Sequence, residues 1–374
     1  MSGIVVDMVA TRAERLSFVK LPWAIYRGDP NWVPPLISDM LRTMDPRHNV
    51  LLRMGPYAHF LARKGGRVVG RVGVGMDGNL NREKRRSEGY FTLFESVNDF
   101  DITRSLFDVA LSWLRQHGAT RVTGPQSPSN GDDYRALLID GFDEPPFLMM
   151  SYNPPYYPEL LSEYGFEKQF DRLAYKYDMT QGIPERFQRL VGRAMERFGF
   201  RIDPVNTRNI EGELRDIKEI VDRSMPEEWP DMVPPTMEEL RAQASQILPV
   251  ADPELILIAR AGDRPVGLVI ALPDYNQVLK HLNGRLFPFG FLKFMWLRRR
   301  ITAARVFVLM VVPEFHKKGV SAAMYLHLFR RAKERGYTLG EGSTVHEFNI
   351  PMRRDAEGVG GVQYKTYRIY QKEL

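Results

Sequence analysis

Apolar residues recur along the chain at strand and helix spacings, and part of this pattern occurs twice. In the first half, residues 62–72 form two apolar runs around a polar glycine turn, which predicts a β-hairpin. Residues 259–269 form the same pattern in the second half. The two eleven-residue stretches align without a gap and share seven identical residues. A repeat of this kind indicates that one fold is present twice.

Two Asn-Pro elements further along the chain support the same repeat. Asn153 precedes Gly165 by twelve residues, and Asn349 precedes Gly361 by the same number. The offset between the hairpins is 197 residues, and the offset between the asparagines is 196. Hairpins recur by chance in many proteins, but two matches in the same order at nearly the same offset favour a duplication.

Both halves therefore predict the same order of elements: a helical N-terminal part, the hairpin, a strand, an amphipathic helix, a strand and a Tyr-rich final strand. The amphipathic helices have apolar residues at 3.6-residue spacing and end at glycines. The expected helices are 11–27, 102–116, 208–224, 236–247 and 320–334, and the expected strands after the hairpins are 90–95, 120–123, 173–178, 305–312, 337–341 and 363–370.

This order predicts a mixed α/β (α+β) fold in which each half is a mixed twisted β-sheet flanked by helices. The length of 374 residues also favours two domains. We expect an N-terminal domain at 1–182, a linker region at 183–204 and a C-terminal domain at 205–374. Within the C-terminal domain, residues 276–304 form an apolar and basic insert.

The composition excludes several classes of protein. The chain has no Cys, which excludes a disulfide scaffold, a thiolate nucleophile and a Cys-ligated metal site. There is also no H-E-x-x-H motif, and we expect no metal. The hydrophobic fraction of 44% excludes disorder. The N-terminus lacks a basic segment followed by an apolar one, so a cytoplasmic protein is expected.

The formal net charge of +6 arises largely from the insert. Residues 275–313 contain seven Lys and Arg and no Asp or Glu. Its apolar part is too short to span a bilayer, but aromatic residues flanked by arginines suit an element that lies in the headgroup region of an anionic membrane. A segment that merely covers the core is the alternative, and a nucleic-acid surface fits less well because the apolar block is contiguous. The membrane candidates are Phe287, Phe289, Phe291, Trp296, Arg298, Arg299 and Arg300.

A glycine loop in the second half predicts an anion site. The strand at 306–312 runs into a basic loop at 313–319 and directly into a helix. Backbone N–H groups and the helix dipole favour negative charge at such a place. The other glycine motif, G-x-G-x-x-G at 73–78, is followed by a sequence that predicts a loop, so we interpret it as the edge of a hairpin.

The basic loop resembles that of the GNAT acyltransferase superfamily, which binds the pyrophosphate of acyl-coenzyme A with a Gln/Arg-x-x-Gly-x-Gly/Ala motif. His316 takes the Gln/Arg place, Gly319 the first Gly and Ser321 the small residue, so two of the three positions depart from the pattern. The resemblance implies acyl-CoA as co-substrate and two tandem GNAT-like domains. The expected coenzyme-binding residues are Leu309, Met310, Val311, His316, Lys317, Lys318, Gly319, Val320 and Ser321.

The corresponding turn of the first half, residues 97–102, has two acids and no glycine. Its acids would repel a phosphate, so we infer that the first half has lost coenzyme binding and serves as a scaffold or a wall for the substrate. Asp99 or Asp101 is then better explained as a helix N-cap than as a catalytic group.

Acyl transfer to an amine needs a base, donors for the tetrahedral oxyanion and an acid for the leaving thiolate. On the GNAT pattern Glu341 is the expected base, with His346 beside it and Asn349 as a polar orienting group. Glu341 could instead cap a turn, and His346 could simply be exposed. Where the superfamily often has a Tyr acid this chain has Glu357, so Tyr367 or Tyr364 is the substitute, each of which could equally be core packing.

The whole chain resembles a bacterial family of tandem GNAT proteins that includes ceramide synthases. This resemblance implies N-acylation of a sphingoid base or similar lipid amine by a long-chain acyl-CoA, at the inner face of the cytoplasmic membrane and without nucleic acid. A soluble N-acetyltransferase for a small amine and a non-catalytic GNAT-like module stay open as alternatives. The motifs that carry the resemblance lie at 26–35, 124–130, 141–146, 152–157 and 340–343.

Overall fold

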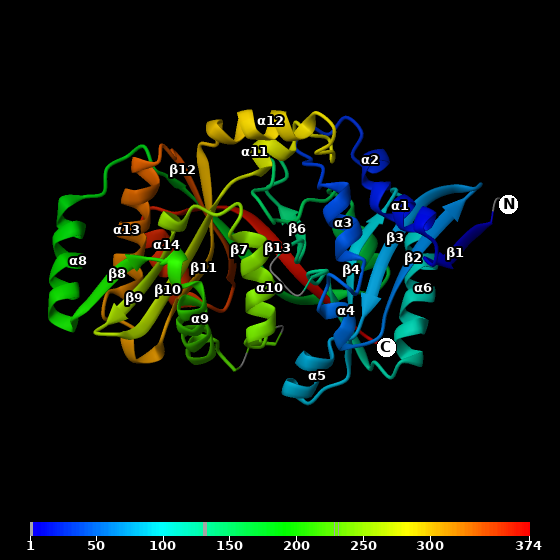
Figure 1. Ribbon diagram of the computed structural model, residues 1–374. Helices are drawn as coiled ribbons and strands as arrows, with labels where there is room; N and C mark the ends of the chain where they lie inside the picture. The colour runs from blue at the N-terminus through cyan, green and yellow to red at the C-terminus, as the bar shows by residue number, and fades with distance from the viewer. Residues whose placement is uncertain (1–2, 130–132, 228, 231) are drawn as a thin grey trace. The chain divides into compact units, whose positions relative to one another are not determined.

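The computed structural model describes residues 3–129, 133–227, 229–230 and 232–374. Asn130, in one of the family motifs, lies outside these residues. The chain forms two compact units: unit 1 comprises Met1–Arg172, Tyr275–Arg300 and Lys365–Leu374, and unit 2 comprises Leu173–Asp274 and Ile301–Tyr364 (Figure 1). Strands β7 (Glu167–Asp178) and β13 (Val362–Glu373) each begin in one unit and end in the other.

The insert and the last ten residues group with unit 1, although the sequence analysis assigned both to the C-terminal domain. The insert is held there by hydrogen bonds. Asn276 Nδ2 donates to Pro146 O at 2.8 Å, and Trp23 Nε1 donates to Asn283 Oδ1 at 2.7 Å. The segment expected as a linker, 183–204, instead contains helix α8 (Glu185–Phe198) and strand β8 (Phe200–Pro204), because its apolar residues pack on unit 2.

Unit 1 contains a mixed sheet with the strand order β1-β2-β3-β4-β5-β13, and β6 also pairs with β13. Strands β1 to β4 are antiparallel neighbours, β4 and β5 are parallel, and β13 closes the unit antiparallel to β5. The strands are β1 (Ile4–Met8), β2 (Tyr57–Lys64), β3 (Arg67–Gly75), β4 (Glu88–Ser96), β5 (Arg121–Gly124) and β6 (Leu137–Asp140). The predicted first hairpin, β2–β3, is confirmed.

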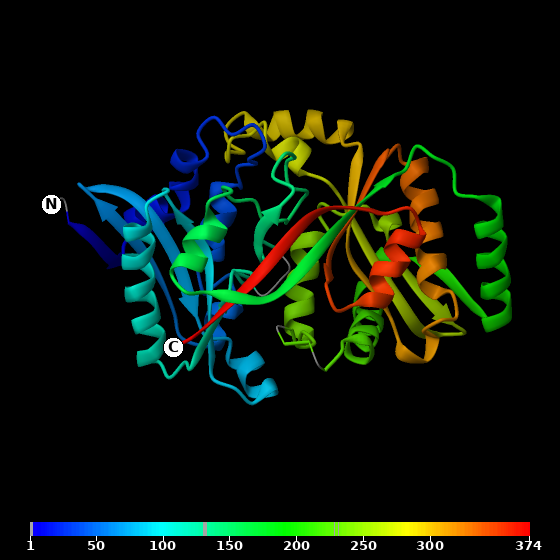
Figure 2. The ribbon, with the colours of Figure 1, turned by 180° about the vertical axis from the view of Figure 1, so that it is seen from behind.

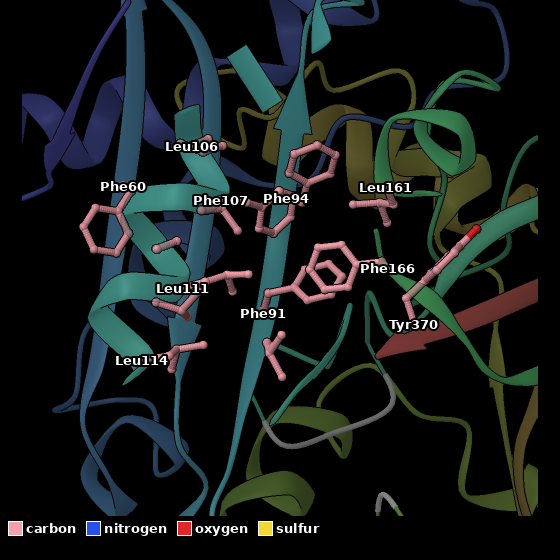
Figure 3. Close-up of a cluster of buried hydrophobic side chains, with 14 of the residues drawn as sticks. Phe60, Phe91, Phe94, Leu106, Phe107, Leu111, Leu114, Leu161, Phe166 and Tyr370 are labelled. Atoms are coloured by element: carbon pink, nitrogen blue, oxygen red, sulfur yellow. The ribbon is translucent and has the colours of Figure 1, made fainter. Parts of the chain in front are cut away.

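Helix α6 (Phe100–Gln116) provides the largest part of the core of unit 1 and confirms the helix expected at 102–116. Leu106, Phe107, Leu111 and Leu114 lie on one face at helical spacing and pack against the aromatic side chains of β4 (Figure 3). Asp99 is the N-cap and accepts from the backbone of Asp101, as expected. The other helices of unit 1 are α1 (Arg12–Lys20), α2 (Pro22–Ile25), α3 (Ile37–Thr43), α4 (Leu51–Met54), α5 (Gly78–Lys84), α7 (Tyr157–Glu163), α11 (Asn276–Leu279) and α12 (Gly290–Leu297).

The G-x-G-x-x-G motif does lead into a short helix, α5, so the loop expected after it is wrong. Asp77 caps this helix by accepting from the backbone of Asn79 and Leu80, a signal that the sequence reading missed. The glycines nevertheless serve packing. A Cβ at Gly75 would lie 2.5 Å from Tyr90 Oη, and one at Gly78 would lie 2.2 Å from a backbone oxygen. Protein atoms therefore occupy the space that a dinucleotide would need.

In unit 2 the strands follow the order β7-β12-β11-β10-β9-β8 (Figure 2). Its hairpin, β9 (Ile256–Ala261) and β10 (Arg264–Pro273), confirms the second copy of the repeat. Strand β11 (Ala303–Val311) runs antiparallel to β10 and parallel to β12 (Leu339–His346). Both units thus have a hairpin, an antiparallel strand and a parallel strand in the same order.

Helices cover both faces of this sheet. Helix α13 (Val320–Glu334), which has the predicted bounds, packs with α8 on the face that contains Leu257 and Ala259, whereas α9 (Ile210–Ser224) packs on the face that contains Ile258. Alternate residues of β9 therefore face opposite layers, as strand geometry requires. The remaining helices of unit 2 are α10 (Met237–Ile247) and α14 (Ile350–Gly358).

Candidate functional site

The candidate site of unit 2 begins where β11 separates from β12. The two strands pair only from Ala303 to Val306 on β11, and β11 has a bulge at Phe307. Val312 N donates to Val266 O at 3.0 Å. Because hydrogen-bonded pairs alternate in an antiparallel ladder, the amides of Leu309 and Val311 point away from β10, on the side where β12 has diverged. Among the predicted coenzyme contacts, these two amides are placed to bind a carbonyl oxygen, and Met310 faces Leu268 on β10.

The basic loop and the first turn of α13 lie where the sequence predicts an anion site. Gly319 is the N-cap of α13 with φ +83°, a conformation that glycine adopts without strain. Ala323 N donates to Gly319 O, so the first turn begins there, and it contains no acidic residue. The amides of Val320 and Ser321 lie in this turn, where N–H groups have no acceptor within the helix.

The side chains of the loop make contacts within unit 2. His316 Nε2 lies 2.9 Å from Val311 O, so the imidazole closes the loop on its own backbone. Ser321 Oγ donates to Asp355 Oδ2 at 2.7 Å. The Lys318 ammonium lies 4.5 Å from the centroid of the Phe315 ring, whereas Lys317 is exposed. An anion would therefore meet backbone amides and lysines here, and the hydroxyl of Ser321 is engaged elsewhere.

Glu341 lies on β12 directly opposite Arg305 on β11, and both side chains are buried, at 0% and 2% exposure. Arg305 Nε lies 3.4 Å from Glu341 Oε2 and donates to Ser343 Oγ at 3.0 Å. Ser343 Oγ in turn donates to Glu341 Oε2 at 2.9 Å. The expected base is thus ion-paired inside the unit, and Ser343 is a hydroxyl through which a proton can reach it.

The other acid–base candidates lie on β12, at the start of α14 and on β13. His346 ends β12 and stacks on Trp229 with 6.4 Å between ring centroids. Asn349 is the N-cap of α14, where its side chain accepts from Met352 N. Tyr367 is buried in unit 1 opposite Leu138, so it does not share a unit with Glu341. Tyr364 lies in unit 2 beneath Lys176, whose ammonium is 4.5 Å from the ring centroid.

Two tyrosines of unit 2 that the sequence reading missed lie close to this site. A Cβ at Gly342 would lie 3.2 Å from Tyr177 Oη, beside Glu341. Tyr177 is hydrogen-bonded to Tyr325 on α13. Burial raises the pKa of Tyr325 to about 12 and raises the pKa of Tyr177 further, so both phenols are protonated at neutral pH. Tyr325 lies on α13, six residues after Gly319.

The insert presents its aromatic side chains to the outside. Phe287 and Phe289 are 77% and 78% exposed, and Trp296 on α12 is also exposed. The guanidinium of Arg300 lies 3.8 Å from the centroid of the Trp296 ring, in a cation–π contact. Phe291, Arg298 and Arg299 are exposed too. No helix in the described part of the chain is long and apolar enough to cross a membrane.

Comparisons with known proteins agree with this geometry. Residues 214–357, which include β11 and the glycine loop, match the acetyltransferase (GNAT) family. A tandem GNAT protein from the clavulanic acid biosynthesis pathway superposes on 99% of this chain and 98% of its own length, with a TM-score of 0.61 and 12% identity, a likeness of fold. The chain therefore has a tandem GNAT fold.

Two curated proteins match nearly the whole sequence. Bacterial ceramide synthase of Caulobacter vibrioides is 31% identical over 98% of this chain and 96% of its own length. Protein YghO of Escherichia coli strain K12 is 28% identical over 96% of this chain and 92% of its own length. The chain belongs to the family of bacterial ceramide synthase, and it is an N-acyltransferase of the GNAT type.

The buried ion pair yields a prediction about stability. Arg305→Met leaves Glu341 without its cation inside unit 2, and breaking a buried pair in this way costs about 3–5 kcal/mol of unfolding free energy. The double variant Arg305→Met, Glu341→Leu replaces the pair by apolar side chains and is expected to recover most of that loss. Urea denaturation measures both, and a double variant as unstable as the single one would contradict the prediction.

Proposed function

We propose that this enzyme transfers a long-chain acyl group from acyl-CoA to the amine of a sphingoid base or a similar lipid amine. The observation that carries the proposal is the near-full-length similarity to bacterial ceramide synthase. The exposed aromatic and cationic insert supports a lipid as acceptor, since a small soluble amine does not require an exposed apolar surface on the enzyme.

The coenzyme would bind along β11 and at the start of α13. Its pyrophosphate would meet the amides of Val320 and Ser321, with Lys317 and Lys318 supplying positive charge. The carbonyl of its thioester would lie against the amides of β11 that face away from β10. The developing oxyanion would then accept a hydrogen bond from the N–H of Leu309 or Val311. Such an N–H is a preorganised donor because the strand β11 holds it in place.

In the proposed chemistry the amine nitrogen attacks the thioester carbon, and the C–S bond breaks as the tetrahedral intermediate collapses. The amine loses its proton to Ser343 Oγ while Ser343 gives its own proton to Glu341, so Glu341 is the base at the end of a short relay. Arg305 holds this carboxylate in place. Tyr325, a phenol that is protonated at neutral pH, would supply the proton that the departing thiolate takes up.

The acceptor would reach the enzyme from a membrane surface. Phe287, Phe289 and Trp296 would enter the headgroup region, and Arg298 to Arg300 would pair with anionic lipid. We therefore propose a protein that works at the inner face of the cytoplasmic membrane without spanning it.

Coenzyme binding is tested with Gly319→Glu. Long-chain acyl-CoA below its micelle concentration should raise the melting temperature of the native enzyme, because a ligand that binds only the folded state stabilises it. The substitution places a carboxylate against the phosphates and a side chain at a positive φ, so this stabilisation should vanish. Gly182→Glu adds the same charge at an open glycine and should retain it.

Because Gly319→Glu could weaken the fold itself, Lys317→Glu with Lys318→Glu provides a second variant that keeps the glycine. Undiminished stabilisation by acyl-CoA in both variants would refute the assigned coenzyme site.

The base is tested with Glu341→Gln, which preserves shape and removes the charge. Turnover should fall roughly 10²- to 10⁴-fold, the range for a positioned acid or base, whereas acyl-CoA should still stabilise the variant. Ser343→Ala should also lower turnover, because it removes the relay. Glu334→Gln, at an exposed position on α13, is the matched control. Full turnover in Glu341→Gln would exclude Glu341 as the base.

Membrane binding is tested by sedimentation with vesicles of phosphatidylglycerol and phosphatidylcholine. The triple variant Phe287→Ser, Phe289→Ser, Trp296→Ser should lower the bound fraction on anionic vesicles roughly tenfold or more, because it removes three exposed aromatic side chains that could insert. Leu190→Ser replaces an exposed apolar residue outside the insert and should change nothing. Equal binding of all three proteins would contradict a role of the insert at membranes.

A further inference from the structure

Unit 1 contains a buried ion pair that the catalytic site of unit 2 does not use. Arg71 on β3 faces Glu95 on β4, with 3.4 Å between Nη2 and Oε1, and the two residues are 4% and 9% exposed. Tyr26 and Tyr157 donate to the other carboxylate oxygen at 3.0 and 2.6 Å. Burial raises the pKa of Glu95, and the guanidinium of Arg71 opposes that effect.

The internal repeat shows that this fold does not require the pair. In unit 1, Gly70 pairs with Ser96 and Arg71 with Glu95. In unit 2, Gly267 pairs with Val311 and Leu268 with Met310. Gly70 and Gly267 are equivalent in the sequence repeat, so the position of the Arg71–Glu95 pair is filled by Leu268 and Met310 in the sister unit.

This exchange is informative because burying two charges has a desolvation cost that an apolar pair avoids. In unit 2 the same two register positions are filled by side chains without charge, and its sheet has the same strand order. A stability role for Arg71 and Glu95 therefore has little support. When the fold does not require charged groups in its core, their presence there indicates a ligand-binding site.

A cavity of about 100 Å³ lies at this pair and within unit 1. Such a volume holds roughly seven or more water-sized groups. Its walls are mostly aromatic, proline, methionine and leucine side chains, including the partly exposed Trp32 and Leu279. Leu279 belongs to α11, so the segment that contains the exposed aromatic residues also supplies a wall of the cavity. The cavity thus joins apolar side chains to one buried pair of opposite charges, and Ser151, Asn153 and Asn276 also line it.

The hydrogen-bonding capacity of the pair defines the ligand. Arg71 Nη1 donates to Phe18 O at 2.7 Å, whereas the buried Nε–H has no partner among the described residues. The bond of Glu95 Oε1 to Arg71 is long, which leaves that oxygen able to accept a stronger donor. A complementary head has a cationic donor for Glu95 next to an acceptor for Arg71. A carboxylate ligand would be repelled by Glu95, and a simple amine would offer no acceptor to Arg71.

From this geometry we propose that the cavity of unit 1 binds the head of a single-chain 2-amino alcohol, with its ammonium on Glu95, its hydroxyl on Arg71 and its chain along the apolar walls. The inference rests on the proposed function in that the acceptor is a lipid amine. It adds a binding site in the half that has lost coenzyme binding, and it names the polar groups that select the head.

Isothermal titration calorimetry of the full chain without acyl-CoA tests the proposal, with 2-amino-1-octanol, octylamine and 1-octanol as probes. The amino alcohol should bind most tightly. Glu95→Gln should weaken its binding roughly 10- to 100-fold, the effect of losing a hydrogen bond to a charged group, and should leave 1-octanol unchanged. Equal affinities for the three probes, or an unchanged affinity in Glu95→Gln, would overturn the proposal.

The sister unit supplies the control for folding. The double variant Arg71→Leu, Glu95→Met installs the pair found in unit 2, so it should fold and should still be stabilised by acyl-CoA while losing the preference for the amino alcohol. Retention of that preference would overturn the proposal. Acyl transfer is measured separately: binding without transfer would refute the proposed function and keep the cavity, and transfer without this binding preference would refute the cavity and keep the function.

Discussion

The short parallel pairing of β11 with β12 is the constraint on which the site of unit 2 depends. Four residues of β11 are paired, and the bulge at Phe307 begins where the pairing ends. In a strand in the middle of a sheet, the backbone N–H groups normally donate hydrogen bonds to both neighbouring strands. Here the following amides on one side are released inside a folded unit, at the point where the chain turns into α13. Glu341 lies in the last paired stretch and Ser343 just beyond it, so the proposed oxyanion donor and the proposed base lie near one strand boundary.

The two units differ in where each places a buried ion pair. Each has a buried arginine–glutamate pair, but the pairs occupy different places. In unit 2 the pair joins β11 and β12, whereas the equivalent parallel strands of unit 1 have Tyr90 opposite Thr123. In unit 1 the pair joins the antiparallel strands, where unit 2 has apolar residues. Since neither pair is needed to form the shared sheet, each marks the place where its unit departs from a common scaffold.

The repeat and the element order could be predicted from the sequence because they depend on local patterns. The hairpins, α6 and α13 follow from apolar periodicity and glycine stops, and α13 has the predicted bounds. The membership of the insert in unit 1 could not be predicted, because it depends on contacts such as Trp23 with Asn283, which are 260 residues apart. The helix after the glycine motif was missed because its sequence is polar, and it begins at an N-cap residue, Asp77, that accepts from two backbone N–H groups of the first turn. Tyr177 was missed for a related reason: only tertiary packing brings it beside Gly342.

The loop at the start of α13 shows why a degenerate motif can still support its chemistry. The two departures from the family pattern, His316 and Ser321, both make hydrogen bonds within unit 2, to Val311 O and to Asp355. Both side chains thus help to hold the loop. What a phosphate needs is a backbone that approaches it closely, and that depends on the positive φ of Gly319, the one position of the motif that is unchanged. The departures from the family pattern thus lie in side chains that hold the loop, whereas the backbone conformation at Gly319 suits the proposed phosphate site.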